Sequence, residues 1–277
     1  MNSYNELTVR YVPITANPTC QSNIHSEIIP CEALRPYIRC FWGTTEPICN
    51  SVTDGTPTLV IPDTCMDIIF NIDYTKNTLD SGFCTIDEIG HYSQTVGTSA
   101  YSIFAVRFYA WSAVLFADNS FSGSKNKYFD TDEFFGGFKA EIIPILMQVT
   151  SLQERSEFLS EYLLKRLNTN RFNSNMMNAV YDIISARGTI TSAELASKNA
   201  ISQRQLERIF NDNMGISPKS FSSLIRYQMM WQEMYSKGGN MLDLTEKYGY
   251  YDEAHMLNDF RKRHSMTPNQ AIRFARK

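Results

Sequence analysis

Hydrophobic and polar residues alternate in short runs over the first part of the chain, from about Leu7 to Phe108. Runs such as TLVIPDTCMDIIFNID (58–73) and YSIFAVRFYAW (101–111) are rich in β-branched and aromatic residues, and turn-forming residues separate them. Several short strands at this spacing predict a β-sandwich or small barrel instead of a sheet built from strand–helix–strand units.

After Ser124 the apolar positions recur at steps of three and four residues, which indicates helices. We expect one helix over residues 131–150, with Pro144 as a kink, and a second helix that begins at the capping box of Ser151. The apolar faces of these helices suit two roles equally well, packing on the sheet or forming a dimer seam. A polar, Asn-rich tract at 167–175 predicts a linker.

The rest of the chain reads as helix throughout. Ser174 is expected to cap a helix that stops at Gly188, and Thr191 begins another capping box. This part also contains an internal repeat, because residues 195–201 return 49 positions later and residues 202–218 return 50 positions later. Each copy predicts a helix, a tight turn and a second helix.

The ends of the two copies predict how each second helix stops. In MGISPKSF (214–221), Gly215 is expected to end a helix in the left-handed conformation, and Ser217 and Pro218 begin the next one. Ser265 takes the glycine's place in the second copy, so its left-handed cap should cost more free energy. Between the copies, a helix over residues 218–236 would span roughly 28 Å at about 1.5 Å per residue.

The outward face of each second helix carries residues that can recognise DNA. Arginine bonds guanine bidentately in the major groove and glutamine bonds adenine, although any solvated helix also displays such residues. Two copies held about one duplex turn apart favour DNA binding over a merely solvated surface. The predicted base-contacting residues are Gln203, Arg204, Glu207, Arg208, Glu253, Ala254 and Asn258. The predicted phosphate-contacting residues are Lys219, Arg226, Arg261, Lys262 and Arg263.

The charge distribution agrees with a polyanionic partner for the helical part. The formal net charge of the chain is −3. Residues 1–170 carry a net charge of −8, and residues 171–277 carry a net charge of +5. An excess this small supports nucleic-acid binding only weakly by itself.

These motifs resemble those of AraC-type (AraC/XylS) transcription regulators, which carry a double helix-turn-helix domain. The matching patterns are S-x-R-x-L-x-R-x-F (202–210), G-x-S-P (215–218), Y-G-Y-x-D-x-A-H-x-x-x-D-F (248–260) and T-P (267–268). In the front part, FW (41–42), I-P-D-x-x-x-D-I-I-F (61–70) and V-R-F-Y-A-W (106–111) resemble a sensor domain found in one branch of that family.

The resemblance implies an α+β protein with three parts. Residues 1–125 would form a cupin-like β-barrel that senses a ligand, and residues 126–170 a helical dimerisation segment. Residues 171–277 would form an all-α DNA-binding domain. Its two helix-turn-helix units, at about 191–213 and 241–264, would flank a linker helix at 218–236.

Three residues of the second copy depart from the family pattern. Besides Ser265, Thr245 stands where alanine is usual, and Asn258 stands where many members carry arginine. The outward positions of this copy are poor in positive charge. We therefore predict that the first unit reads sequence and that the second mainly positions the protein on DNA.

The front domain offers aromatic and charged residues that could form a ligand pocket or could simply be core and structural ion pairs. The candidates are Phe41, Trp42, Asp63, Asp67, Phe70, Tyr101, Phe104, Arg107 and Trp111. Arg107 is the most informative of them. If it were buried without a carboxylate partner, it would indicate an anionic group on the ligand.

Catalysis, metal binding and thiol chemistry find little support. The six cysteines have no C-x2-C spacing, so we expect no zinc site and mostly packed free thiols, with thiol sensing as an alternative. The same spacing argues against the methyltransferase regulators that join an AraC-type domain to a zinc-bound cysteine. Only His25 and His91 lie in the front domain, without an H-x-H pair, which disfavours a catalytic cupin. No catalytic residue, cofactor or metal is expected.

We therefore expect a cytoplasmic, nucleoid-associated transcription regulator, since the chain shows no signal peptide and no membrane-spanning run. The resemblance implies double-stranded DNA as partner, RNA polymerase if the protein is an activator (the commoner mode), an unknown small-molecule effector, and a homodimer through residues 131–167. A constitutive or thiol-responsive regulator without a small-molecule ligand is the alternative.

Overall fold

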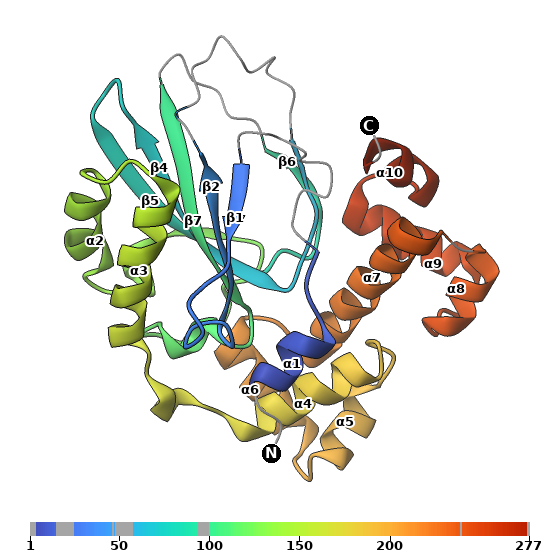
Figure 1. Cartoon of the computed structure of the whole chain (residues 1–277). Coiled ribbons are helices and arrows are strands. Elements are labelled where there is room, and N and C mark those ends of the chain that lie inside the picture. The colour runs from blue at the N-terminus through green and yellow to red at the C-terminus, as the bar shows by residue number, and fades with distance from the viewer. Residues whose placement is uncertain are drawn as a thin grey trace.

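An antiparallel sheet makes up most of the N-terminal half of the molecule (Figure 1). The computed structural model describes residues 4–14, 25–45, 47, 58–93, 100–238 and 240–275. Six strands pair in the order β1-β2-β7-β4-β5-β8, and β3 pairs with β6 in a second, two-stranded sheet. The strands are β1 His25–Ile28, β2 Ile38–Thr44, β3 Thr58–Val60, β4 Cys65–Asp73, β5 Thr78–Cys84, β6 His91–Ser93, β7 Tyr101–Tyr109 and β8 Tyr128–Asp130.

The α+β class is confirmed, but the expected barrel is not closed. Among the described residues, the six-stranded sheet has β1 at one edge and β8 at the other. The two-stranded β3–β6 sheet is a separate element. The N-terminal domain is therefore an open antiparallel sheet with a smaller sheet beside it.

Alternation along the strands divides the six-stranded sheet into two faces. On one face Phe70 stacks on Phe104 of the adjacent strand, with ring centroids 5.6 Å apart. The helices α2 (Phe138–Leu146) and α3 (Leu152–Arg166) lie along the sheet (Figure 1), and Phe138 of α2 stacks on Phe70. The other face carries Arg107.

The helical segment that follows the sheet differs in detail from its prediction. A short 3₁₀ turn at Thr131–Glu133 replaces the start of the expected helix, and α2 begins only after Gly137, whose φ of 74° interrupts the helical path. Pro144 lies inside α2 and Ser151 caps α3, both as predicted. The apolar residues of α3, including Leu159 and Leu163, are fully buried within the chain, so packing on the sheet is their role here.

The C-terminal part is entirely helical among its described residues, as predicted. Its helices are α4 Ser174–Ser185, α5 Ser192–Lys198, α6 Gln203–Met214, α7 Pro218–Lys237, α8 Met241–Lys247, α9 Glu253–His264 and α10 Pro268–Ala275. Asn173 caps α4 in place of the expected Ser174, because its side chain accepts the Met176 amide hydrogen at 3.0 Å. The short N-terminal helix α1 (Tyr4–Arg10) packs against α4.

The two parts share one hydrophobic core. Trp111, just after β7, stacks on Tyr109 and meets Phe221 of α7 edge-on, with ring centroids 6.3 Å apart. Both Trp111 and Phe221 are fully buried. No described helix combines the length and the apolar character needed to span a bilayer.

Candidate nucleic-acid interface

The first helix-turn-helix unit, α5 and α6, is built by the predicted caps. Thr191 and Glu194 form a reciprocal capping box at the start of α5. Ser202 caps α6 by accepting the Gln205 amide hydrogen at 3.1 Å. The turn between the helices contains Ala200 at a φ of 53°, a conformation that is uncommon for alanine. Inward residues of α6 are buried, so its opposite face points away from the core.

That outward face is open to a partner. All four predicted base-contacting residues of this unit are exposed, and Arg204 and Arg208 take part in no ion pair with another described residue. A surface groove runs along this face, lined by Ser202, Arg204, Gln205, Glu207, Arg208, Asn211 and Ser217. Two unpaired guanidinium groups beside an open groove match the chemistry that major-groove recognition needs.

The exit from the first unit has the predicted geometry. Gly215 ends α6 at a φ of 72°, and Ser217 caps α7 by accepting the Ser220 amide hydrogen at 3.1 Å. Pro218 occupies the first turn of α7, where its missing amide hydrogen costs nothing. A side chain at position 215 would also collide with the Phe121 carbonyl oxygen, only 2.7 Å from an added Cβ atom.

The second unit, α8 and α9, repeats this construction with different residues. Asp252 caps α9 by accepting the His255 amide hydrogen at 2.7 Å, and Ser265 ends the helix at a φ of 58°. Thr245 is buried, and its hydroxyl donates to the Met241 carbonyl oxygen at 2.7 Å, so the polar group is satisfied where alanine is usual. The outward residues Glu253, Ala254 and Asn258 are exposed.

Two of the five predicted phosphate-contacting residues are engaged in contacts within the chain. Lys219, Arg261 and Lys262 are exposed, but Arg263 is only 4% exposed and donates to the Ser223 hydroxyl at 2.7 Å and to the Glu88 carbonyl oxygen at 3.3 Å. Arg226 lies 4.1 Å over the Tyr250 ring and 3.8 Å from Asp259. Arg226 therefore packs α7 against the second unit, and Arg263 joins the end of α9 to α7 and to the N-terminal domain. Sequence spacing alone does not show which side of each helix is covered.

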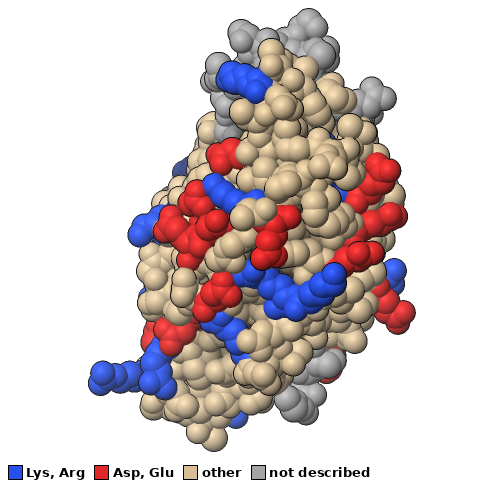
Figure 2. Space-filling model, turned by 90° about the vertical axis from the view of Figure 1, so that its left-hand side faces the viewer, with Lys and Arg blue, Asp and Glu red and all other residues tan. Residues whose placement is uncertain are grey.

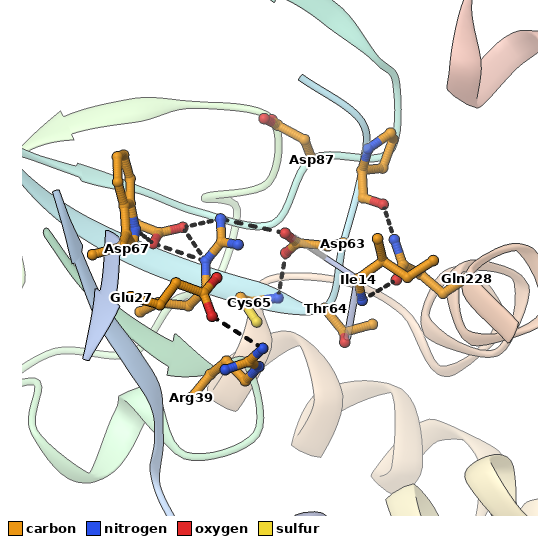
Figure 3. Close-up of polar contacts among 12 residues, drawn as sticks. Ile14, Glu27, Arg39, Asp63, Thr64, Cys65, Asp67, Asp87 and Gln228 are labelled. Carbon is orange, nitrogen blue, oxygen red and sulfur yellow. Dashed lines mark hydrogen bonds and ion pairs between the residues drawn. The ribbon is translucent and has the colours of Figure 1, made fainter. Parts of the chain in front are cut away.

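In the N-terminal domain, Arg107 is buried together with two carboxylates (Figure 3). Its Nε and Nη2 atoms donate to Asp67 at 3.0 Å each, and Nη2 lies 3.4 Å from Asp63. The Trp42 indole N–H also donates to Asp67, at 2.8 Å. Arg107 therefore has the carboxylate partners whose absence would have indicated an anionic ligand.

The second carboxylate leaves this cluster with excess negative charge. Burial raises the pKa of Asp63 to about 6, although the neighbouring Arg107 favours the ionised carboxylate. One oxygen of Asp63 accepts the Cys65 amide hydrogen at 2.7 Å (Figure 3). Asp63 therefore stabilises the turn that leads into β4.

The nine proposed pocket residues do not gather in one place. Phe41, Phe70 and Phe104 are fully buried on the sheet face that carries the α2 contact. Trp111 is buried at the contact with α7. Trp42 and Tyr101 are partly exposed, and alternation along β7 puts Tyr101 on the face of Arg107. The candidates come from both faces of the sheet, since successive side chains of a strand point to opposite faces and only every second residue can line one pocket.

Of the four described cysteines, Cys31 is exposed, and the other three are poorly suited to thiol chemistry. Burial raises the pKa of Cys40 to about 12 and raises the pKa values of Cys65 and Cys84 as well. A raised pKa keeps a thiol protonated and unreactive. Cys20 and Cys49 lie outside the described residues, and the described His, Cys, Asp and Glu side chains form no group of three suited to a metal ion.

Sequence reasoning missed one residue that joins the two domains, Gln228 of α7. It is fully buried and bonded to backbone groups of the N-terminal domain (Figure 3). The signal in the sequence was a polar residue inside the apolar face of the predicted 218–236 helix. A polar side chain is normally buried only where it has hydrogen-bond partners. The partners of Gln228 lie far away in the sequence, so its neighbours along the chain do not reveal them.

Two family models match the chain. Residues 195–273 match a helix-turn-helix domain, and residues 26–130 match a domain of unknown function (DUF6597). A comparison with curated proteins gave no significant match.

Several solved structures are similar to the chain. A transcriptional regulator from Chromobacterium violaceum, described as containing an AraC-type DNA-binding domain, is 19% identical over 36% of this chain and 91% of its own, with a TM-score of 0.35. The C-terminal domain of AraT, a response regulator from Geobacillus stearothermophilus, is 22% identical over 37% and 87%, with a TM-score of 0.35. ToxT from Vibrio cholerae is 10% identical over 84% and 98%, with a TM-score of 0.41.

The chain thus carries an AraC-type helix-turn-helix domain at its C-terminal end, behind a sheet-rich N-terminal domain.

Proposed function

We propose that this DNA-binding transcription regulator recognises a specific operator through α6 and positions itself on the same duplex through α9. The observation that carries the proposal is the pair of helix-turn-helix units at the two ends of α7, each with an exposed outward face. With 20 residues, α7 is roughly 30 Å long at about 1.5 Å per residue. This length suits two recognition helices in successive major grooves, which lie about 34 Å apart.

The residues of the first unit are assigned to base recognition. Arg204 and Arg208 would each pair with a guanine, and Gln203 with an adenine, through the hydrogen-bonding edges that the major groove displays. Glu207, on the same face, can accept from cytosine. The exposed Lys219, before the middle of α7, would hold the phosphate backbone alongside.

The second unit is assigned mainly to positioning. Its outward residues Glu253, Ala254 and Asn258 offer no positive charge to a base, whereas Arg261 and Lys262 at the end of α9 are exposed and basic. Phosphate contacts set the register of a protein on DNA without reading sequence. This unit would therefore add affinity that falls as salt concentration rises.

The N-terminal domain is assigned to the control of DNA binding. We place it at residues 1–125, the helical segment at 126–170 and the DNA-binding domain at 171–277, in a cytoplasmic, non-enzymatic regulator. A small-molecule effector would act on the domain, and RNA polymerase would be the partner of an activator. Because Arg107 already has carboxylate partners, an anionic group on the effector is not required.

A homodimer through residues 131–167 is part of the same proposal. The buried apolar faces of α2 and α3 are used within the chain, so a second copy would meet their outer surface. Figure 2 shows acidic and basic side chains interspersed over this side of the molecule. Exposed apolar side chains such as Ile145 and Leu164 would join the charged ones in such a contact.

The proposal is tested by selecting binding sites for the intact protein from a random duplex library. We expect a motif whose two parts lie about 10 base pairs apart, since that is one helical turn. The selected duplex should bind at least about 1,000-fold more tightly than random DNA at physiological salt. Equal binding to selected and random duplexes would show that the protein does not read sequence.

A further inference from the structure

The N-terminal domain contacts the C-terminal part at both recognition-helix exits and at the middle of α7. At the first exit, the Phe121 amide donates to the Asp212 carbonyl oxygen at 2.9 Å, and Asn211 donates to the Ser122 hydroxyl at 2.5 Å. The backbone of Gly215 lies directly against Phe121, as the collision of an added Cβ atom demonstrates. The end of α6 is therefore held by residues that follow β7.

The second exit is held in a similar way. The Arg263 guanidinium donates to the Glu88 carbonyl oxygen, and the Ser265 hydroxyl donates to the Gly90 carbonyl oxygen at 3.4 Å. A Cβ atom on Gly90 would fall 2.3 Å from the Arg263 carbonyl oxygen, so the two backbones are in close contact there. The end of α9 thus meets the segment between β5 and β6.

Between these exits, Gln228 joins α7 to two separate segments of the N-terminal domain (Figure 3). Its Nε2 atom donates to the Pro62 carbonyl oxygen at 2.6 Å, and its Oε1 atom accepts the Ile14 amide hydrogen at 2.9 Å. Gln228 is 0% exposed, so losing either bond would leave a buried polar group without a partner. Both ends of one amide are therefore committed to the contact between the domains.

The Gln228 contact leads directly to the buried charge cluster of the sheet. Pro62 immediately precedes Asp63, which lies beside Arg107 and Asp67 on β7 and β4 (Figure 3). A movement of Asp63 would be passed through one peptide unit to the carbonyl group that Gln228 holds. The chain thus provides a short physical connection from the sheet interior to α7.

None of these contacts covers the proposed DNA-reading faces, because the outward residues of α6 and α9 are exposed. What the contacts restrain is the relative placement of the two units. α7 alone restrains it less, since it joins the units through Gly215 and Gly238, two glycines at positive φ. No described atom lies within 4 Å of a Cβ atom built on Gly238.

We propose that Gln228 is a positioning residue through which the N-terminal domain fixes the separation of the two recognition helices. The inference rests on the proposed function, because it concerns how the two units meet one duplex. With Gln228 in place, the protein accepts one spacing between the two parts of its site. Without it, the units adjust to other spacings.

The test substitutes Gln228→Met in the full chain. Methionine matches glutamine in length and helix propensity but makes neither hydrogen bond. The matched control is Gln270→Met on α10, where the exposed side-chain amide oxygen accepts hydrogen bonds from Thr267, at 2.9 Å. Affinity is measured for the selected duplex, for duplexes with one or two base pairs inserted between the two parts, and for a duplex carrying only the first part.

We expect wild type and the Gln270→Met control to lose at least about tenfold in affinity on insertion, as for a mismatched site. The Gln228→Met protein should lose less than about threefold while binding the single-part duplex normally. If Gln228→Met loses as much affinity on insertion as wild type does, the inference is overturned and the proposed function remains intact. Failure of the wild-type protein to select any sequence would instead overturn the function.

Binding to the single-part duplex also reports whether the variant is folded. If Gln228→Met does not bind it, Gln228→Glu replaces it and is assayed at pH 8, since an ionised carboxylate accepts from Ile14 but cannot donate to Pro62. Relaxed spacing in Gln228→Glu supports the inference, and unchanged spacing contradicts it. A purely stabilising role would lower affinity for all duplexes equally and would not alter the ratio between spacings, so that result also contradicts it.

Discussion

The two helix-turn-helix units have the same backbone conformation but place their glycines differently. Each unit has a left-handed residue in the turn between its helices and another after its recognition helix. The first unit uses Ala200 and Gly215 at these places, and the second uses Gly249 and Ser265. The first copy therefore also holds a residue with a side chain at positive φ, besides Ser265, where the sequence predicted such a cost. Each copy contains one glycine and one residue with a side chain, so the repeat preserves conformation and not residue type.

The units differ more strongly on their surfaces and in their cores. Arg204 and Arg208 of the first unit correspond to Ala254 and Asn258 of the second, 50 residues later. Inside, Met214 corresponds to His264, and both are buried. The two units therefore differ in DNA recognition, in pH dependence and in backbone strain. Each difference can be tested by substitutions at corresponding positions of the two units.

The largest expected effect concerns DNA recognition. Arg208→Ala should weaken binding to the selected duplex by about 1–3 kcal/mol and remove the preference at one base pair, because a bidentate contact is lost. Asn258→Ala should cost less than about 1 kcal/mol. Fluorescence anisotropy with the selected duplex measures both, and Lys76→Ala, at an exposed position between β4 and β5, is the control. A larger loss for Asn258→Ala than for Arg208→Ala would reverse the assigned roles of the units.

The next effect concerns the pH dependence of folding. Burial lowers the pKa of His264 to about 4, and its Nδ1 atom lies 2.8 Å from the Tyr227 hydroxyl. In the unfolded chain the imidazole takes up a proton near pH 6.5, so acidification favours unfolding. This contribution to stability is fully present above about pH 6.5 and is lost progressively towards pH 4.

His264→Met gives the second unit the residue of the first and should abolish this contribution. Between pH 7 and pH 5, His264 should lower the free energy of unfolding of wild type by about 2 kcal/mol. Urea unfolding at the two pH values measures this change. Asp63 changes the stability in the opposite direction, because its pKa is raised by burial and its ionisation destabilises the fold as pH rises. Wild type and His264→Met both contain Asp63, so the difference between them reports His264 alone. Equal pH slopes for wild type and variant would show that His264 is not held neutral by the fold.

The smallest effect concerns backbone strain. Ala200→Gly should raise the free energy of unfolding by about 0.5–1 kcal/mol, since glycine adopts a positive φ without steric cost. Ser265→Gly should raise it by less, because the hydroxyl bond to Gly90 is lost. Thermal unfolding of each variant, compared with wild type, measures the difference. A decrease in stability for Ser265→Gly would mean that its contact with the N-terminal domain outweighs the strain.

Features that depend on neighbours within a few residues were predictable. Thr191, Ser217 and Ser151 cap helices where expected, because a cap needs only a side-chain oxygen and the amides of the next turn. The exception near Ser174 is a shift of one residue to Asn173. The interruption of the 131–150 helix at Gly137 was missed, since apolar periodicity continues across the glycine.

The sequence by itself determined the repeat, the two recognition helices and their exposed outward residues, because these follow from helical periodicity and local capping. Tertiary structure decided which charged residues remain available to DNA. Arg263 and Arg226 have the right type and spacing for phosphates, yet Arg263 is buried and Arg226 packs against Tyr250 and Asp259 of the second unit. Tertiary structure also paired Arg107 with Asp63 and Asp67 and brought Gln228 to Pro62 and Ile14. These contacts join residues far apart in the chain, so local sequence cannot specify them and only the packing of the two domains brings them together.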